Sequence, residues 1–209
     1  MTPGPTSVYE CPICTKLITR GSIMSGNTIG YKLYSDGKSF APMLPEYPNL
    51  TSCKNCQSIF WLKELEEIGN FTWRESENLE WKKADQAEFL TINEYFRAIE
   101  TDIAEKDELY IRLRIWWSYN DRLRTGREIF MDEEDQLKWS ENILKMMDLL
   151  DPTDLNEKIM LAEAHRNLGD FDACEKLILS IDNDELNEIK VKFIYQCKRK
   201  NKWVIQLNK

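Results

Sequence analysis

Six cysteines are the residues of this 209-residue sequence whose type and spacing could do chemistry. Four of them form two Cys-x-x-Cys pairs, Cys11 with Cys14 and Cys53 with Cys56. One such turn directs two thiolates at an ion, and two turns together supply the four sulfur ligands of a tetrahedral zinc site. We therefore predict one structural Zn²⁺ held by these four cysteines. A sulfur cage also accepts iron, so the residue types leave the metal in the cell open.

Two other interpretations of the paired cysteines are less favoured. Disulfides are disfavoured because Met1–Pro5 does not open a secretory signal. A thioredoxin-like redox motif needs one pair beside a strand and helix, rather than two pairs. The remaining two cysteines, Cys174 and Cys197, stand at apolar helical positions, which favours small core residues over ligands.

The elements that must position the four ligands lie mostly between the two pairs. Residues 29–34 are aromatic and β-branched, and the turn sequence Ser-Asp-Gly-Lys comes next at 35–38, so we expect strands on both sides of that turn. Residues 41–48 contain three prolines and are expected to run extended around the β-structure. The apolar run at 59–62 is expected to dock this small domain on the C-terminal part of the chain. We predict a zinc-ribbon domain over residues 1–62.

Residues 63–209 are predicted to form a helical domain, so the fold class is α+β and mainly α. Thr91 and Glu94 match a capping box that opens a helix over 92–104. Apolar residues recur at steps of three and four over 109–123 and 137–150. Residues 155–188, with a Gly-Asp-Phe-Asp turn, resemble a tetratricopeptide repeat, which implies two packed helices.

The main alternative for the repeat is a generic antiparallel helical bundle, because three or more repeats are the norm and fewer than two are visible here. An isolated helix pair cannot bury its own apolar face, so a capping helix is expected from residue 186 onward. Residues 203–207 could extend that helix or form a short packed strand.

The net charge of -8 is distributed unevenly along the chain. Residues 1–60 contain five basic and three acidic groups, residues 61–189 contain sixteen and thirty-three, and residues 190–209 contain seven and none. An acidic body disfavours nucleic acid and anionic membranes as partners, because both need a positive field. The basic end is expected to complement a helix C-terminus and the acidic body, with a phosphate or partner contact as the alternative.

A cluster of large polar and aromatic side chains is the candidate partner site. Arginine and tryptophan dominate binding hot spots, so a groove near residue 120 could hold a peptide. The competing interpretation places the tryptophans in the core and pairs the arginines with the acidic body. The candidate residues are Trp116, Trp117, Asn120, Arg122 and Arg124, with Asp121 among them.

Motifs for catalysis are missing from the sequence. The one histidine, His165, stands where the repeat places a packing aromatic, and no Gly-x-Ser-x-Gly or phosphate-binding glycine loop occurs. We therefore expect no enzymatic activity, with a redox or metal-handling enzyme as the residual possibility.

Several motifs together resemble an uncharacterised group of bacterial proteins. They are Ser25–Thr28, the Ser-Asp-Gly-Lys turn, Ala41–Pro45, the two cysteine pairs, and a Trp-Trp-x-x-Asn-Asp-x-x-Arg segment. The resemblance covers most of the chain, implies no activity, and supports a bacterial, cytoplasmic origin.

The functional expectation is a non-enzymatic, zinc-containing protein-interaction module that binds a protein or peptide through its helical surface. The alternative is a zinc-ribbon nucleic-acid binder that uses the ribbon and the basic C-terminal tail. The longest apolar runs are far shorter than the roughly 18 residues of a spanning helix, so no membrane is expected as a partner.

Overall fold

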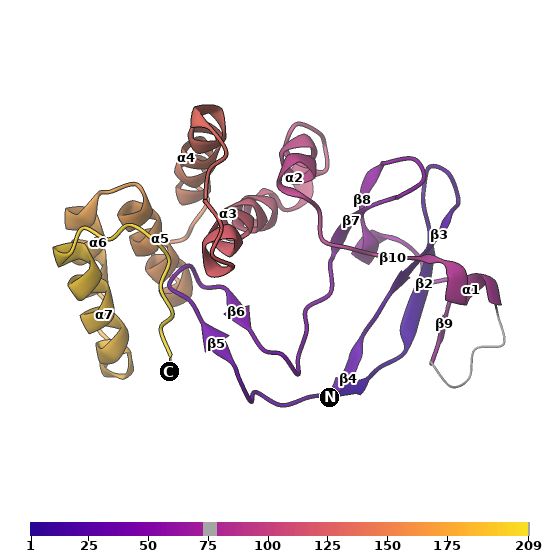
Figure 1. The fold of residues 1–209 in the computed structure, drawn as a ribbon, viewed down its shortest axis with the longest axis horizontal. Helices are drawn as coiled ribbons and strands as arrows, with labels where there is room; N and C mark the ends of the chain where they lie inside the picture. Colours follow the sequence, from indigo (N-terminus) through magenta and orange to yellow (C-terminus); the bar gives the residue numbers. More distant parts are fainter. Residues whose placement is uncertain (73–78, 209) are drawn as a thin grey trace. The chain divides into compact units, whose positions relative to one another are not determined.

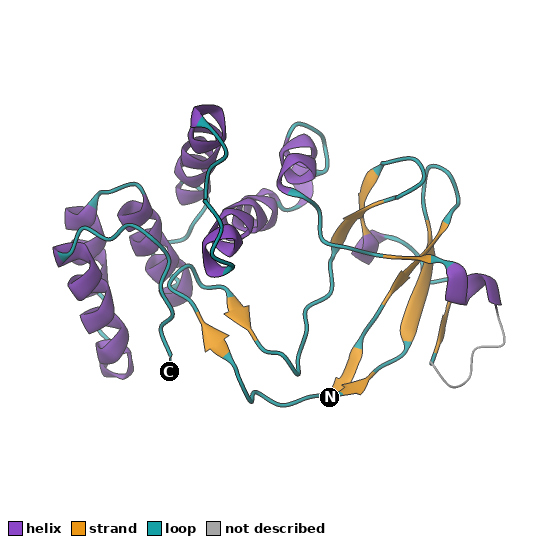
Figure 2. Ribbon diagram, viewed as in Figure 1, coloured by secondary structure: helices purple, strands orange, loops and turns teal. Residues whose placement is uncertain are grey.

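The computed structural model describes residues 1–72 and 79–208 of the chain (Figures 1 and 2). The described part is α+β and mainly helical, as predicted, with seven α-helices and four small sheets. It divides into two compact units. The first comprises residues 1–31 and 40–107, and the second comprises residues 32–39 and 108–209.

A four-stranded sheet forms the centre of the first unit, in the order β10-β3-β2-β9. Its hairpin pairs β2 with β3 in antiparallel register, with Val8 opposite Thr19. Val8 and Ile18 are fully or almost fully buried, so the hairpin contributes a core face. The bounds are β2 Thr6–Glu10, β3 Leu17–Arg20, β9 Gly69–Phe71 and β10 Asp85–Gln86.

A second hairpin, β7 (Leu50–Ser52) with β8 (Ile59–Trp61), completes the set of β-elements around the cysteines. Phe60 of β8, together with Leu62 directly after it, joins the same core as Tyr9 and Ile18. Trp61 is buried and donates its indole N–H to the carbonyl of Ile103 at 3.1 Å. The apolar run at 59–62 is thus used inside the first unit. The N-terminal β1 (Thr2–Pro3) pairs with β4 (Ile23–Ser25).

The short helices of the first unit are α1 (Leu79–Lys83) and α2 (Ile92–Ile99). The predicted capping box is confirmed, because the Thr91 hydroxyl accepts from the Glu94 amide and the Glu94 carboxylate accepts from the Thr91 amide. The helix ends at Ile99, whereas the prediction extended it to residue 104. Short 3₁₀ turns occur at Leu62–Glu64 and Ala104–Lys106.

Five helices form most of the second unit. Asp132, Asp154 and Asp170 each cap a helix N-terminus with the side chain, which satisfies amides that lack a partner within the helix. The helices are α3 Glu108–Arg124, α4 Glu133–Met147, α5 Leu155–Asn167, α6 Phe171–Leu179 and α7 Asn187–Lys198, with a 3₁₀ turn at Asp184–Leu186 before the last.

Helices α5, α6 and α7 pack in sequence order around one core. Gly169 adopts a left-handed φ of 87° in the tight turn between α5 and α6, where a glycine carries no steric cost. Cys174 and Cys197 are buried in this core, as the sequence predicted. The chain end is a short packed segment, since Leu207 N–H donates to Leu33 O and Gln206 forms a bridge with Tyr34.

A hairpin from between the two cysteine pairs belongs to the second unit. Strands β5 (Lys32–Leu33) and β6 (Ser39–Phe40) flank the Ser-Asp-Gly-Lys turn, as predicted. Residues 32–39 lie with the helices (Figure 1). Ser35 and Asp36 are fully buried there.

This division differs from the expected boundary at residue 62. Residues 63–107 do not join the helical domain, because β9 and β10 extend the sheet of the first unit on both sides of the β2–β3 hairpin. The expected ribbon over 1–62 also loses its central hairpin to the helices. None of the described helices is long and apolar enough to cross a membrane.

Candidate functional site

Each Cys-x-x-Cys pair lies in the turn of a hairpin, and the two turns have matching backbone hydrogen bonds. In the β2–β3 turn, Cys11 N–H donates to Lys16 O at 2.9 Å and Thr15 N–H donates to Cys11 O at 2.9 Å. In the β7–β8 turn, Cys53 N–H donates to Ser58 O at 2.9 Å, and the amide of residue 57 donates to Cys53 O at 2.8 Å. The repeated spacing in the sequence therefore produces a repeated local structure.

The residue after each second cysteine reverses the chain with a left-handed backbone. Thr15 has φ 57° and Gln57 has φ 60°. Such values are uncommon for residues other than glycine, and especially for a β-branched threonine. Both positions close the turn that brings two thiols together, so the local strain is tied to the geometry of the pair.

The four thiols converge on one point. Their sulfur atoms all lie within 4.8 Å of one another, and all six cysteines of the chain are free thiols. Cys11 Sγ lies 3.6 Å from Cys56 Sγ, and Cys14 Sγ lies 3.6 Å from Cys53 Sγ. Sulfur atoms bound to zinc at about 2.3 Å would stand about 3.8 Å apart at the corners of a tetrahedron. The donor set and its spacing therefore fit a tetrahedral metal ion.

Backbone amides and a hydroxyl surround the sulfur atoms. Burial raises the pKa of Cys11, but hydrogen bonds from Ser58 and from the amides of Cys14 and Ile13 outweigh it, so the net pKa is lowered. Burial raises the pKa of Cys53 to about 11 despite donors from the amides of its own turn. Four thiolates need a cation to share one site, and the amides already direct their dipoles at the sulfurs.

Ser58 is a site residue that the sequence analysis missed. Its Oγ lies 3.0 Å from Cys56 Sγ and 3.4 Å from Cys11 Sγ, so one hydroxyl contacts both turns. Ser58 stands two residues after Cys56, and Lys16 stands two residues after Cys14. A serine hydroxyl at this position of the second turn was the signal that the sequence offered. Cys11 and Cys53 are 1% exposed, and the other two cysteines are half-buried. A closed set of four sulfur ligands leaves no position for a substrate.

Two residues of the predicted partner site are buried in the second unit. Trp116 and Asn120 are buried, and the Trp116 indole donates to Asn167 Oδ1 at 2.8 Å. Arg122 pairs with Asp135 at 2.6 Å. The competing core interpretation therefore describes Trp116 and Asn120, while Trp117, Arg122 and Arg124 are half-buried.

The hairpin turn fills the place where a peptide was expected. Asp36 accepts from Asn120 Nδ2 at 2.7 Å and pairs with the Arg124 guanidinium. The Trp117 indole donates to Asp36 O at 2.9 Å, and Lys38 Nζ pairs with Asp121 at 2.5 Å. Residues 35–38 of the chain itself thus satisfy the aromatic, amide and guanidinium groups of α3.

A second buried polar group on α5 holds the other side of the turn. Ser35 Oγ donates to Glu163 Oε1 at 2.9 Å, and Arg166 contacts Glu163 at 2.6 Å with both side chains at 0% exposure. Arg166 Nη1 also donates to the carbonyls of Asn201 at 2.5 Å and Trp203 at 3.0 Å. The sequence analysis assigned no role to Glu163 or Arg166. Their position beside the buried alanines of α5 was the signal for them.

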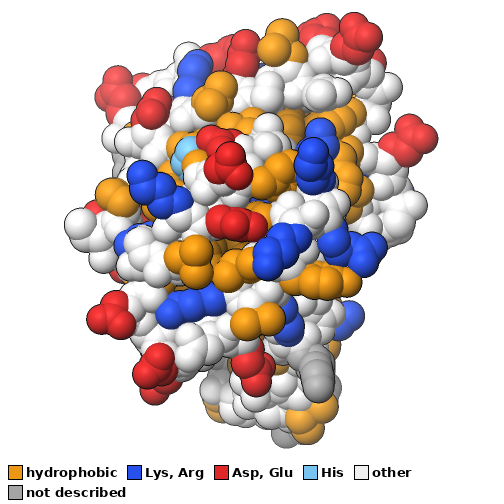
Figure 3. All heavy atoms as spheres, turned by 90° about the vertical axis from the view of Figure 1, so that its left-hand side faces the viewer, with side chains coloured by type: hydrophobic (Ala, Val, Ile, Leu, Met, Phe, Trp, Pro, Cys, Tyr) orange, Lys and Arg blue, Asp and Glu red, His pale blue; other side chains and the backbone are white. Residues whose placement is uncertain are grey.

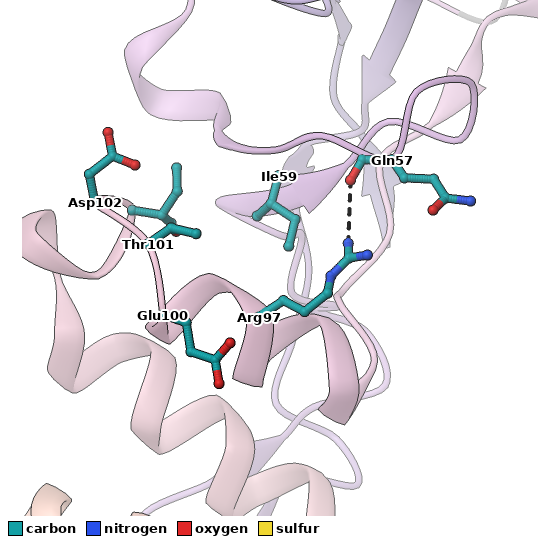
Figure 4. Close-up of a pocket in the computed structure, with 7 residues that line it drawn as sticks. Gln57, Ile59, Arg97, Glu100, Thr101 and Asp102 are labelled. Atoms are coloured by element: carbon teal, nitrogen blue, oxygen red, sulfur yellow. Dashed lines mark hydrogen bonds between the residues drawn. The ribbon is translucent and has the colours of Figure 1, made fainter.

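A groove of about 520 Å³ lies in the first unit, beside the second cysteine turn (Figure 4). Arg97 Nη2 donates across it to Gln57 O at 3.3 Å. The only hydroxyl among its lining residues belongs to Thr101, and it already donates to Ala98 O at 2.9 Å. The Thr101 hydroxyl is therefore held by the backbone of α2. Its lining residues are Gln57, Ile59, Arg97, Glu100, Thr101, Asp102 and Ile103.

His165 contacts the residue that caps α6. Its Nδ1 lies 3.3 Å from Asp170 Oδ2 at the turn between α5 and α6.

The chain was compared with protein-family models, curated proteins and solved structures, and none of them matches the chain.

Proposed function

We propose that this chain is a non-enzymatic zinc protein that binds a protein or peptide partner through the surface of its helices. Cys11, Cys14, Cys53 and Cys56 hold one Zn²⁺ that stabilises the first unit. The zinc assignment is supported by four free thiols in two matching turns, because four-sulfur sites of this spacing are typical of structural zinc. Reduced thiols are also typical of the cytoplasm, where we place the protein.

The single observation that carries the interaction role is a set of large exposed apolar side chains on α4, α6 and α7 of the second unit. Large exposed apolar residues that recur on neighbouring helices mark interaction surfaces, whereas isolated ones are ordinary. Their exposed fractions run from 53% to 66%. The residues are Leu137, Leu144, Leu179, Val191 and Tyr195.

Affinity capture with the zinc-loaded chain tests this role. The bait is compared with a variant that carries Leu137→Asp and Val191→Asp, both at exposed positions. We expect a protein that the native chain retains and the variant loses, and that binds again when both components are purified. Identical capture by the two baits, or none by either, would overturn the proposal.

The redox or metal-handling alternative predicts labile metal and reactive thiols. Elemental analysis combined with thiol titration separates it from a structural site. One tightly held zinc per chain with the four turn thiols protected supports our proposal. Metal lost on simple dialysis, with thiols that react at once, supports the alternative.

Nucleic-acid binding is the second candidate, and one observation favours it. Lys198, Arg199 and Lys200 are consecutive and exposed at the end of α7. Binding through phosphates would weaken steeply with salt, because neutralised phosphates release their counterions. A salt titration with DNA and RNA oligonucleotides tests this candidate, and no binding at low salt removes it.

A further inference from the structure

Two outer helix faces of the second unit carry exposed residues at the same spacing. Along α4 and the residue that caps its C-terminus, residues 134, 137, 141, 144 and 148 succeed one another at alternating steps of three and four, which aligns them along one side of the helix. Leu137 is 57% exposed and Leu144 is 54% exposed. On α7, residues 191, 195 and 198 have the same steps. Val191 is 66% exposed and Tyr195 is 53% exposed.

The two faces carry opposite charge. The acidic face of α4 alternates its leucines with carboxylates, and among the described residues Glu141 and Asp148 form no ion pair. The face of α7 begins with the exposed carboxylate of Glu188, three residues before Val191, and ends in the exposed cations Lys198 and Arg199, so its net charge is positive. Arg199 donates to the Tyr195 hydroxyl at 2.9 Å and lies over its ring at 5.4 Å, which holds this cation beside the apolar part of the face.

Figure 3 looks onto the side of the molecule where α6 and α7 lie. Apolar side chains on this side lie among Lys and Arg side chains, with some Asp and Glu side chains between them. Both faces remain exposed in one chain, so they do not cover each other. A partner for either face therefore has to be another molecule.

We infer that the acidic face of α4 in one copy docks on the basic face of α7 in a second copy. The inference deepens the proposed function, on which it rests, by naming a second copy of this chain as a partner. The two faces are complementary in charge and match in spacing. The leucines and carboxylates of α4 can align with the apolar residues and cations of α7, as two helices do when apolar seams are flanked by opposite charges.

The contact is heterologous, since one surface meets a different surface on the partner. Each bound copy therefore leaves one face of each kind free at the ends, and growth continues as a chain of copies or closes as a ring. The contact uses few apolar residues, so association is weak and reversible. Salt weakens it, because the charges lie at the surface.

Sedimentation of the full-length, zinc-loaded chain tests the inference. At tens to hundreds of micromolar in low salt, we expect a weight-average mass above the 24.7 kDa of one copy, which rises with concentration and falls with added salt. A native chain that sediments as one copy at every concentration would overturn the inference. If such a chain still retains another protein in the capture experiment, the proposed function stands and only the second copy is excluded.

Two variants at exposed positions locate the contact. One carries Lys198→Glu with Arg199→Glu, and the other carries Glu141→Lys with Asp148→Lys. We expect each variant alone to sediment as one copy, and an equimolar mixture to associate, because each variant keeps the face that the other has lost. A variant that associates alone as the native chain does would indicate pairing of like faces and refute the inference.

A matched control carries Lys82→Glu with Lys83→Glu, two exposed lysines of α1 in the first unit. It changes the net charge by the same amount as the Lys198 and Arg199 variant. We expect it to associate as the native chain does. Loss of association in the control would show that net charge alone governs self-association, which contradicts docking at α7.

Discussion

The buried pair Glu163 and Arg166 allows the sharpest test of how the hairpin turn is held. Both side chains are 0% exposed and contact each other at 2.6 Å. Removing one partner of a buried ion pair leaves an uncompensated charge and costs about 3–5 kcal/mol. We therefore expect Arg166→Met to lower the free energy of unfolding by about that amount, out of a total of about 5–15 kcal/mol for a typical domain.

The double variant Glu163→Leu with Arg166→Met separates the pair from its surroundings. With both charges gone no buried charge is left, so the double variant should cost less than the sum of the two single variants by about 2 kcal/mol or more. Hydrogen bonds lost to Ser35, Asn201 and Trp203 remain as a residual cost of about 1 kcal/mol each.

The assay is urea unfolding of the zinc-loaded chain monitored by helical circular dichroism. It is run at about pH 8, above the raised pKa of Glu163, so that the carboxylate is ionised. The matched control is Lys138→Met, which removes an exposed pair with Glu134 and should leave the free energy of unfolding almost unchanged. Single variants that cost no more than this control, or costs that simply add, would refute the reasoning.

Three further predictions concern the metal site, the hairpin turn and the buried carboxyl group. Removal of the metal by a chelator should release about one equivalent of zinc. It should also expose the amides of Cys11 and Cys53 to hydrogen exchange while α3 and α5 keep their protection, because the four sulfurs join hairpins of the first unit. An equal loss of protection in both units would contradict the division of the chain into two units. Asp36→Ala should destabilise the helices by about 3 kcal/mol in urea unfolding, because Arg124 and Asn120 lose their buried partner, whereas the exposed control Asp182→Ala should be neutral. Burial raises the pKa of Glu163 from 4.5 to about 7, so between these pH values the folded state holds a proton that the unfolded state has lost, and stability should fall as pH rises through that range. Thermal unfolding of Glu163→Gln should depend less steeply on pH. An unchanged pH dependence in this variant would count against the raised pKa.

Local rules predicted the features whose causes lie within a few residues. The Cys-x-x-Cys spacing predicted which four sulfurs would converge, and the Thr91 capping box predicted where α2 begins. The helical period placed α3 to within one residue at each end. The helix over 92–104 was predicted too long, because α2 ends at Ile99.

The division into units could not be predicted by these rules. Strands β9 and β10 are three and two residues long, too short for a period of two to be visible in the sequence. Their assignment to the first sheet depends on pairing with β2 and β3, which lie more than sixty residues away along the chain. Such pairing is a property of the folded chain.

The sequence by itself determined which four cysteines converge, the capping box of α2 and the turn at 35–38, because each depends on residue types at short spacing. Only the tertiary structure decided where that turn is placed. Asp36 meets Asn120 and Arg124, and Ser35 meets Glu163, across separations of more than eighty residues. Burial of these charges is favourable only when both sides arrive together, and no local period encodes that meeting.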